Sequence, residues 1–339
     1  MVRCFVASPS EPEPPSSTRT ARRVLCDSLV LAQQTGADVT VVTDPSIADV
    51  VLFVERHRSE DDLPRVMQMP IYRDYRHKFV VHNGKDYPRA LVPGLYPNLS
   101  ERWAGILGCQ GAPFLNDPNP FLTADISWNG HVERLASFFG DCLRKPIRAK
   151  LLSRAAGAAW RDISITETAA EFNGTRLRGD IEAHNELKRA FVLDLRSAKF
   201  ALCPRGTGAS TYRLFEAMQC GRAPVVISDG WARPPGPDWD SFAIFVAERH
   251  IDDLPRILRS REGEWEERGA KAQAAWRAFY SPERVGMTVV HQAIDVLRVS
   301  NAKRLFTSVM TKMYVKGPRE IELLQWRLSR KLRRMLARQ

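Results

Sequence analysis

A loop of small residues lies in the second half of the chain, between an apolar run and a helical pattern. The apolar run ends at Pro204, the loop reads Arg205-Gly-Thr-Gly-Ala-Ser210, and a helix is expected over Thr211–Gln219. Glycines let the backbone turn sharply and approach a ligand closely. The N–H groups and the dipole at the start of a helix favour an anion. The spacing therefore predicts an anion site, for which a diphosphate is a natural ligand.

Side chains around this loop suit a nucleotide. Arg205 and Arg213 would neutralise the phosphates, and hydroxyls would donate hydrogen bonds to them. Glu216, on the first turns of the helix, would accept hydrogen bonds from a ribose diol. The alternative is a plain turn with a good helix start. No Lys-Ser or Lys-Thr pair follows the last glycine, which disfavours a P-loop ATPase. We predict a nucleotide site formed by Arg205, Gly206, Thr207, Gly208, Ser210, Thr211, Arg213 and Glu216.

Apolar runs alternate with helical patterns on both sides of the loop. In the first half, strands are expected at 3–7, 37–43, 48–54 and 78–82, with a helix at 19–34. The alternation restarts with strands at 135–139, 162–166, 200–203, 225–227 and 242–246, and helices at 147–159, 181–198, 211–219, 251–258, 262–280 and 284–299. This order implies two βαβ modules with parallel sheets. Residues 87–129, rich in Pro, Gly and Asn, are expected to be irregular and to line a cleft.

The segment around the loop resembles the signature of the exostosin family, glycosyltransferase family 47. The matching stretches are Ser197–Phe200, Pro204–Gly206, Ser210–Ala217, Gly221–Asp229 and Trp239–Phe242. Weaker matches lie upstream at His82, Pro93–Pro97 and Ala136–Gly140. The resemblance extends over residues 1–298 and is strong over 195–256.

This resemblance implies an α/β fold of the GT-B type, with two Rossmann-like, doubly wound domains facing a central cleft. The expected domains are an acceptor-side domain at 1–132, a nucleotide-sugar-binding domain at 133–300 and a basic helical tail at 301–339. The implied activity is inverting transfer from a UDP- or GDP-sugar to a glycan or lipid-linked glycan, in the synthesis of surface polysaccharide or lipopolysaccharide. Gly221-Arg222 replaces the usual Gly-Cys, and the membrane anchor of eukaryotic members is not seen. Both differences favour a cytoplasmic relative.

Inverting transfer needs a base that deprotonates the acceptor hydroxyl. In open parallel sheets ligands lie at the carboxyl ends of the strands. Glu55 follows the expected strand 48–54, His82 ends the strand 78–82, and Asp86 comes shortly after it. These three are candidate bases, with Asp86 and Glu55 preferred to His82. Each also has a plainer interpretation as a solvated loop residue or a strand cap.

The resemblance implies no metal or other cofactor, because GT-B enzymes commonly stabilise the leaving diphosphate with Arg, hydroxyls and a helix dipole. Asp238-Trp-Asp240 is the one candidate for a DxD-type metal motif, and we interpret it as a loop anchored by Trp239. The six cysteines form no CxxC pair and are expected to be reduced, mostly buried thiols.

The net charge of +11 is concentrated at the C-terminus, where residues 301–339 hold 11 Lys and Arg but only two Glu. The rest is nearly neutral, which argues against a nucleic-acid-binding protein. Residues 321–336 combine an apolar stripe with a basic face, which indicates a helix that binds an anionic membrane surface or packs back on the first domain. No apolar run is long enough to span a bilayer. We expect a cytoplasmic glycosyltransferase, peripheral on the inner face of the membrane. A non-catalytic sugar-nucleotide-binding relative or scaffold remains the alternative.

Overall fold

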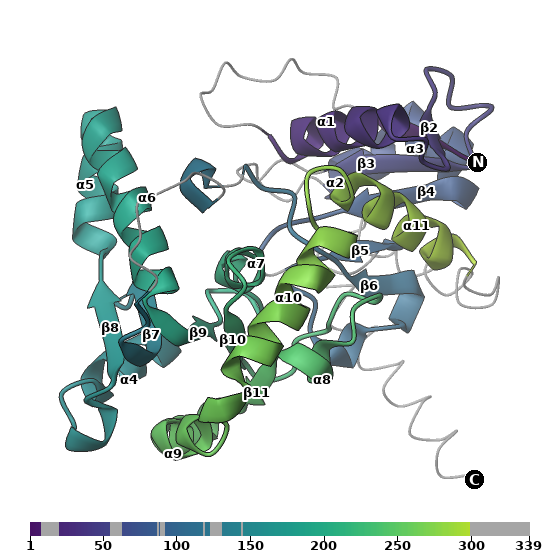
Figure 1. The fold of residues 1–339 in the computed structure, drawn as a ribbon. Coiled ribbons are helices and arrows are strands. Elements are labelled where there is room, and N and C mark those ends of the chain that lie inside the picture. The colour runs from purple at the N-terminus through teal and green to yellow at the C-terminus, as the bar shows by residue number, and fades with distance from the viewer. Residues whose placement is uncertain are drawn as a thin grey trace, which may run out of the picture.

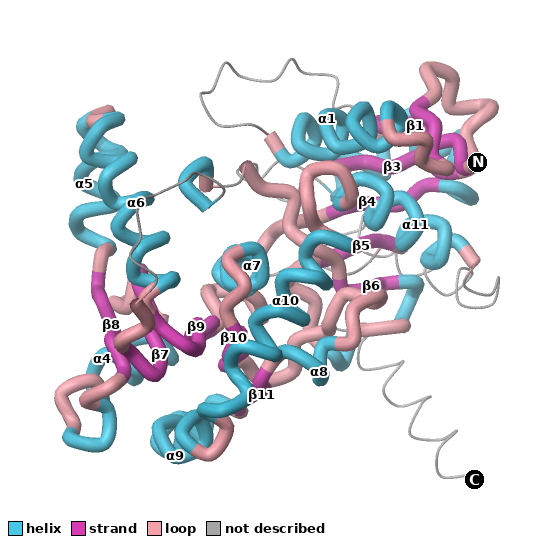
Figure 2. The backbone as a smooth tube through the Cα atoms, in the orientation of Figure 1, coloured by secondary structure: helices cyan, strands magenta, loops and turns pink. Residues whose placement is uncertain are grey.

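The computed structural model describes residues 1–7, 20–54, 63–86, 88, 92–117, 119–122, 131–143 and 145–298. They form two parallel β-sheets, each flanked by helices (Figures 1 and 2). The expected α/β fold with two Rossmann-like domains is confirmed. Glu55 and the tail at 301–339 lie outside the described residues. Within the described ranges, no helix combines the length and the apolar character that crossing a membrane requires.

The first sheet has six parallel strands in the order β2-β1-β3-β4-β5-β6. Its strands are β1 (Val2–Ala7), β2 (Val39–Val41), β3 (Val50–Val54), β4 (Phe79–His82), β5 (Gly94–Tyr96) and β6 (Cys109–Gly111). Its helical segments are α1 (Ala21–Gln34), α2 (Leu63–Gln68), α3 (Pro70–Tyr75), η1 (Arg76–Lys78), η2 (Glu101–Trp103) and η3 (Ile106–Gly108). The expectation that residues 87–129 are irregular was wrong for β5 and β6. Each has three residues, too few to show a period in the sequence.

The second sheet has five parallel strands in the order β11-β10-β9-β7-β8. Its strands are β7 (Arg134–Gly140), β8 (Ile163–Glu167), β9 (Ala198–Pro204), β10 (Ala223–Ile227) and β11 (Ile244–Val246). Its helices are α4 (Pro146–Arg154), α5 (Ala169–Arg178), α6 (Ile181–Arg196), α7 (Tyr212–Gln219), α8 (Trp239–Phe242), α9 (Leu254–Arg259) and α10 (Trp265–Phe279). The 3₁₀ segments η4 (Pro120–Leu122), η5 (Ala158–Trp160), η6 (Glu248–Asp253) and η7 (Glu262–Glu264) complete it. Helix α5 was not expected, because Gly174 and polar residues interrupt its apolar period.

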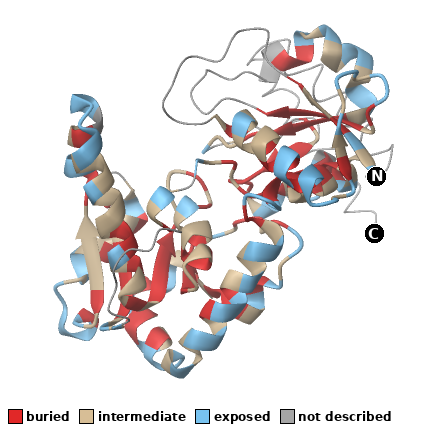
Figure 3. Cartoon of the chain, turned by 45° about the horizontal axis from the view of Figure 1, so that its top comes forward, coloured by how far each residue is buried: buried red, intermediate tan, exposed pale blue. Residues whose placement is uncertain are grey.

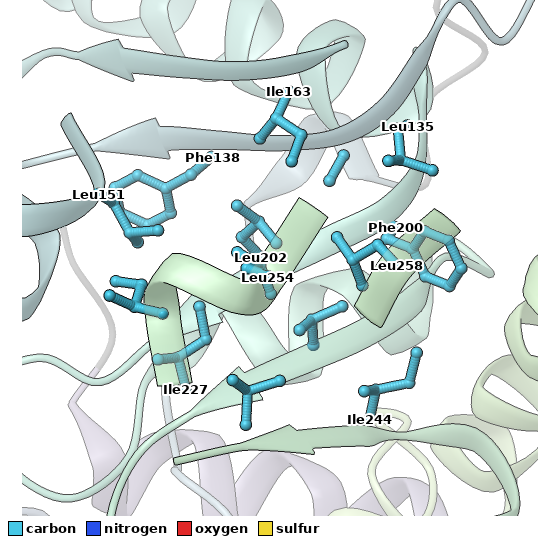
Figure 4. Close-up of a cluster of buried hydrophobic side chains, with 14 of the residues drawn as sticks. Leu135, Phe138, Leu151, Ile163, Phe200, Leu202, Ile227, Ile244, Leu254 and Leu258 are labelled. Carbon is cyan, nitrogen blue, oxygen red and sulfur yellow. The ribbon is translucent and has the colours of Figure 1, made fainter. Parts of the chain in front are cut away.

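Both faces of the second sheet are covered, as alternate residues of β9 show. Phe200 and Leu202 face a core that includes residues of α4 and α9 (Figure 4), whereas Ala201 and Cys203 face α6, α7 and α10. Side chains of a strand alternate between faces, so a strand that is apolar throughout must be covered on both. Figure 3 shows the buried strands of both domains in red. All six cysteines are free thiols and four are buried, as expected.

Helix α11 (Val285–Leu297) packs on the first sheet, although it follows the second in the chain. Val289 and Ala293 share a core with Leu25 and Leu29 of α1. Figure 1 shows α11, yellow-green, beside the purple α1. The expected domain 133–300 includes this helix, whereas the structure places it with the first sheet. The chain therefore crosses between the sheets after β6 and returns between α10 and α11.

Candidate functional site

The carboxyl edges of the two sheets face each other and meet along a seam. The loop after β5 runs beside the loop after β10, with backbone hydrogen bonds from Ala232 N to Leu99 O (2.8 Å) and from Glu101 N to Gly230 O (2.7 Å). The indole of Trp231 donates to the carbonyl of Pro97 at 2.9 Å. Because every strand is parallel, both partners leave the carboxyl end of their sheet, where α/β proteins place their ligands.

The small-residue loop is part of this seam. It joins β9 to α7, and Gly206 N donates to Ser210 O at 3.1 Å across the turn. Gly208 lies against the first domain: a Cβ there would stand 2.4 Å from Asn98 Oδ1 and 2.7 Å from Asp86 O. Glycine is therefore required at 208 by the approach of the opposite domain, whatever ligand binds nearby.

No side chain caps the start of α7. The N-cap residue, Thr211, makes no capping hydrogen bond. Its hydroxyl oxygen instead lies 3.3 Å from a guanidinium nitrogen of Arg148. The hydroxyl of Ser210 is buried and has no hydrogen-bond partner within the described chain. A helix start without a side-chain cap and a buried hydroxyl without a protein partner can both bind an acceptor from a ligand. The predicted anion site thus keeps its capacity for a ligand.

Arg213 and Glu216 lie one turn apart on α7, with Arg213 Nε and Glu216 Oε2 separated by 3.8 Å. The guanidinium of Arg213 donates to the carbonyl of Phe139 and lies over the rings of Phe138 and Phe191, 4.9 and 4.4 Å from their centroids. Burial lowers the pKa of Arg213. Burial also raises the pKa of the Glu216 carboxyl, and the charge of Arg213 opposes that rise. The structure brings the predicted pair together, but the contacts described for the arginine are made to residues of the second domain.

Two basic residues that the sequence did not single out complete the site. The ammonium of Lys145 donates to the hydroxyl of Thr207. Arg148 donates to the carbonyls of Pro204 (3.2 Å) and Arg205 (3.1 Å), so it holds the base of the loop. Burial and the charge of Arg213 lower the pKa of Arg148 to about 10. Both residues follow β7, and β7 pairs with β9. That pairing is a property of the sheet order, which no spacing in the sequence reveals.

The side chain of Arg205 is engaged as well, because its guanidinium pairs with both carboxylate oxygens of Glu248 after β11. Lys145 therefore differs from Arg205, Arg148 and Arg213: its described contact is a single neutral hydroxyl. A half-buried ammonium without a described carboxylate partner, at the edge of the anion site, is a suitable phosphate ligand.

Two of the three candidate bases, Asp86 and His82, lie in the described residues, and they occupy different places. The exposed Asp86 lies beside the loop, with its carbonyl oxygen close to Gly208. Partial burial raises the pKa of the Tyr212 hydroxyl, and the charge of Asp86 raises it further, so this carboxylate lies near the start of α7. His82 is buried, and its Nε2 lies 2.9 Å from the carbonyl oxygen of Pro113. Glu55 is outside the described residues. Asp86 is thus the candidate that the structure brings to the loop.

A cavity of about 390 Å³ lies farther along the seam. None of the predicted nucleotide-site residues lines it. The lining residues are Glu101, Ala104, Gly105, Gly108, Cys109, Gln110, Gly111, Ala232, Arg233, Pro235 and Val296.

The stretch Asp238-Trp-Asp240 forms the start of α8, with Asp238 at the N-cap, so the expected loop was wrong, although Trp239 anchors the stretch as expected. Trp239 is buried and its indole donates to Pro234 O at 2.8 Å, while Asp240 pairs with Arg233 at 2.9 Å. Across the part of the chain that the structure describes, no group of three His, Cys, Asp or Glu side chains is arranged to hold a metal ion.

Solved structures that are similar to this chain include HepE and TarM. Anabaena HepE in complex with UDP and glucose gives a TM-score of 0.40 at 11% identity, covering 88% of this chain and 100% of that one. TarM gives a TM-score of 0.36 at 11% identity, covering 76% and 52%.

Curated proteins match over the segment that holds the site. The "Exostosin-1 homolog" of Caenorhabditis elegans is 43% identical over 68 residues, which cover 20% of this chain and 18% of that protein. Exostosin-1 of Drosophila melanogaster is 38% identical over 68 residues, covering 20% and 9%. The chain thus spans less than a fifth of the length of these relatives. Residues 116–261, which include β7 to β11, Lys145, the loop and α7, match the family model of the Exostosin GT47 domain. The predicted resemblance is confirmed: this part of the chain is similar to the Exostosin GT47 domain of the family model and to these exostosin-1 proteins.

Proposed function

We propose that the protein is a glycosyltransferase that moves a sugar from a nucleotide-sugar donor, a UDP- or GDP-sugar, to a glycan or lipid-linked glycan acceptor. The observation that carries the proposal is the uncapped start of α7 beside the buried hydroxyl of Ser210, inside the exostosin GT47 match. An N-terminal helix end with an unused hydroxyl is suited to the diphosphate of such a donor. Action in surface polysaccharide or lipopolysaccharide synthesis, a cytoplasmic location and membrane binding through 321–336 belong to the same proposal.

The residues of the seam divide the reaction between the two domains. The diphosphate would lie at the start of α7, with Ser210 and Lys145 donating to its oxygens and Glu216 accepting from the ribose. The acceptor oxygen attacks C1 of the sugar from the face opposite the diphosphate, and the bond from C1 to the phosphate oxygen breaks with inversion. Asp86 takes the acceptor proton. Positive groups at α7 stabilise the charge on the departing diphosphate.

A panel of nucleotide sugars tests this function directly. We expect a UDP- or GDP-sugar to raise the melting temperature in a thermal-shift experiment that also includes CMP- and dTDP-sugars, because a ligand that binds only the folded state stabilises it. Release of the nucleoside diphosphate should follow when an acceptor, or water in its place, takes the sugar. A protein that is stabilised by no nucleotide sugar, and releases no nucleoside diphosphate, would contradict the proposal.

Replacing Lys145 with methionine should weaken binding of the nucleoside diphosphate and leave binding of the nucleoside unchanged. Loss of one charged hydrogen bond costs about 1.5–3 kcal/mol, which is roughly a 10- to 150-fold rise in Kd. Isothermal titration of both ligands measures the difference. Lys150→Met is the matched control, because Lys150 lies on α4 and pairs with Asp252. If Lys145→Met binds the diphosphate as tightly as the native protein, Lys145 is not a phosphate ligand.

Transfer should persist in excess EDTA. The expectation rests on the cationic and helix-dipole groups at the start of α7, which can stabilise the leaving diphosphate by themselves. The measurement is nucleoside-diphosphate release with EDTA, and then with Mg²⁺ or Mn²⁺ added back. Loss on chelation with rescue by either ion would contradict the expectation and direct attention to Asp238 and Asp240.

A further inference from the structure

Asn98, directly after β5, connects the two domains through both ends of its side-chain amide. Its Nδ2 donates to the carbonyl of Lys85 at 3.0 Å, and its Oδ1 accepts from the backbone N–H of Ser210 at 3.1 Å. The residue is only 5% exposed. An amide can donate and accept at once, which a carboxylate cannot do when ionised. One buried side chain therefore joins the loop after β4, the loop after β5 and the loop after β9.

The groups that Asn98 binds lie next to the candidate base and next to the proposed position of the diphosphate. Lys85 precedes Asp86, the candidate base, and its own N–H donates to Asn83 Oδ1 at 2.9 Å. Both backbone polar groups of Lys85 are thus fixed by asparagine side chains. Ser210 precedes Thr211, the N-cap residue of α7, where the diphosphate would lie. The contact of Gly208 with Asn98 excludes any larger side chain from this junction.

We infer that Asn98 is a positioning residue for sugar transfer. It holds the loop after β4, which carries Asp86, at a fixed distance from the loop after β9, which carries Ser210. The inference rests on the proposed function. The base and the nucleotide come from different domains, so their relative position depends on contacts across the seam. A displacement of about 1 Å between reacting groups can cost about 10²-fold in rate. Asn98 binds the loops after β4 and β9 but belongs to neither of them. Its loss should therefore change the rate of sugar transfer more than the affinity for the donor.

The test compares two Asn98 variants with a matched control. Asn98→Ala removes both hydrogen bonds, whereas Asn98→Asp keeps an acceptor for Ser210 N–H and loses the donor for Lys85 O. Gln292→Met is the control, because Gln292 Nε2 donates to Pro235 O at 3.1 Å, another amide contact between the domains that touches neither loop. The probes are UDP- and GDP-sugars, the readout is kcat for nucleoside-diphosphate release, and Kd is measured with UDP and GDP.

We expect kcat to fall by about 10²-fold in Asn98→Ala, with Kd little changed, and to fall in Asn98→Asp as well. Gln292→Met should resemble the native protein in both quantities. Native kcat in Asn98→Ala, an equal loss in Gln292→Met, or a Kd that changes as much as kcat would each overturn the inference while leaving the proposed function intact. Tighter UDP or GDP binding by Asn98→Ala would also overturn it, because Asn98 would then compete with the donor. A native protein that neither binds nor cleaves any of the probes would instead refute the proposed function, and this inference with it.

Discussion

Replacing Gly208 with alanine is expected to lower donor turnover by about two orders of magnitude, although the change adds a single methyl group. That methyl would meet the side chain of Asn98 at 2.4 Å and the carbonyl oxygen of Asp86 at 2.7 Å. The carbonyl is backbone and Asn98 is held at both ends, so neither can give way cheaply. The loop must move away from the first domain, and overpacking of this kind costs about 1–3 kcal/mol. Steady-state release of nucleoside diphosphate measures the loss.

Two other glycines serve as controls for this change. Gly263→Ala places a methyl where nothing lies within 4 Å, and should leave both turnover and melting temperature unchanged. Gly206 belongs to the same loop as Gly208, but a Cβ there would meet protein atoms no closer than 3.6 Å. Gly206→Ala should therefore keep the native melting temperature, and any loss of donor affinity would report contact with the ligand. If Gly208→Ala releases nucleoside diphosphate as fast as Gly263→Ala does, the contact of Gly208 with the first domain is not as tight as described.

Replacing Glu216 with glutamine should raise the Kd for the nucleoside diphosphate by roughly 10- to 150-fold, the cost of about 1.5–3 kcal/mol for a charged hydrogen bond. Glutamine keeps the volume of the side chain and removes its charge. The same reasoning gives a pH dependence. Because burial raises the pKa of Glu216, donor binding should be strong above that pKa and weaken as the pH falls through it.

The ribose contact can be separated from a structural role of Glu216. The carboxylate also faces the buried guanidinium of Arg213, so the variant can lose stability as well as affinity. A 2′,3′-dideoxy nucleoside diphosphate lacks the diol and should bind the native protein and Glu216→Gln equally. Glu266→Gln, at an exposed position of α10, is the control for the substitution itself. If the variant loses the same factor for both ligands, Glu216 acts by holding Arg213 and does not contact the ribose.

The sequence predicted the parts of the fold that have long, regular patterns. The apolar runs that became β3, β9 and β10 were recognisable because a strand covered on both faces is apolar throughout. The glycine loop was recognisable because a helix start follows it, and the Arg213–Glu216 pair because the two residues lie one turn apart on that helix. Strands β5 and β6 were not, because three residues with Gly and Cys carry no period.

What the sequence could not supply depends on neighbours in space. Lys145 reaches the loop because β7 lies next to β9 in the sheet. The pairing of Arg205 with Glu248 likewise requires loops after separate strands to share one edge. Gly208 seemed to serve ligand approach, and the structure shows that it serves the approach of the other domain. Whether Glu216, Ser210 and Asp86 bind donor and acceptor stays a prediction.

The return of α11 to the first sheet makes the second domain an insertion within a discontinuous first domain. The exostosin-matched segment 116–261 omits α10, whose Ala272 belongs to one core of the second sheet. The segment excised alone would leave that apolar face open to water, and residues 1–132 alone would leave α1 without the Val289 and Ala293 contacts. Exchange of the second domain between related proteins therefore needs two crossover points, one near residues 131–133 and one near 280–285. A recombinant cut only once would separate α11 from the sheet that it stabilises.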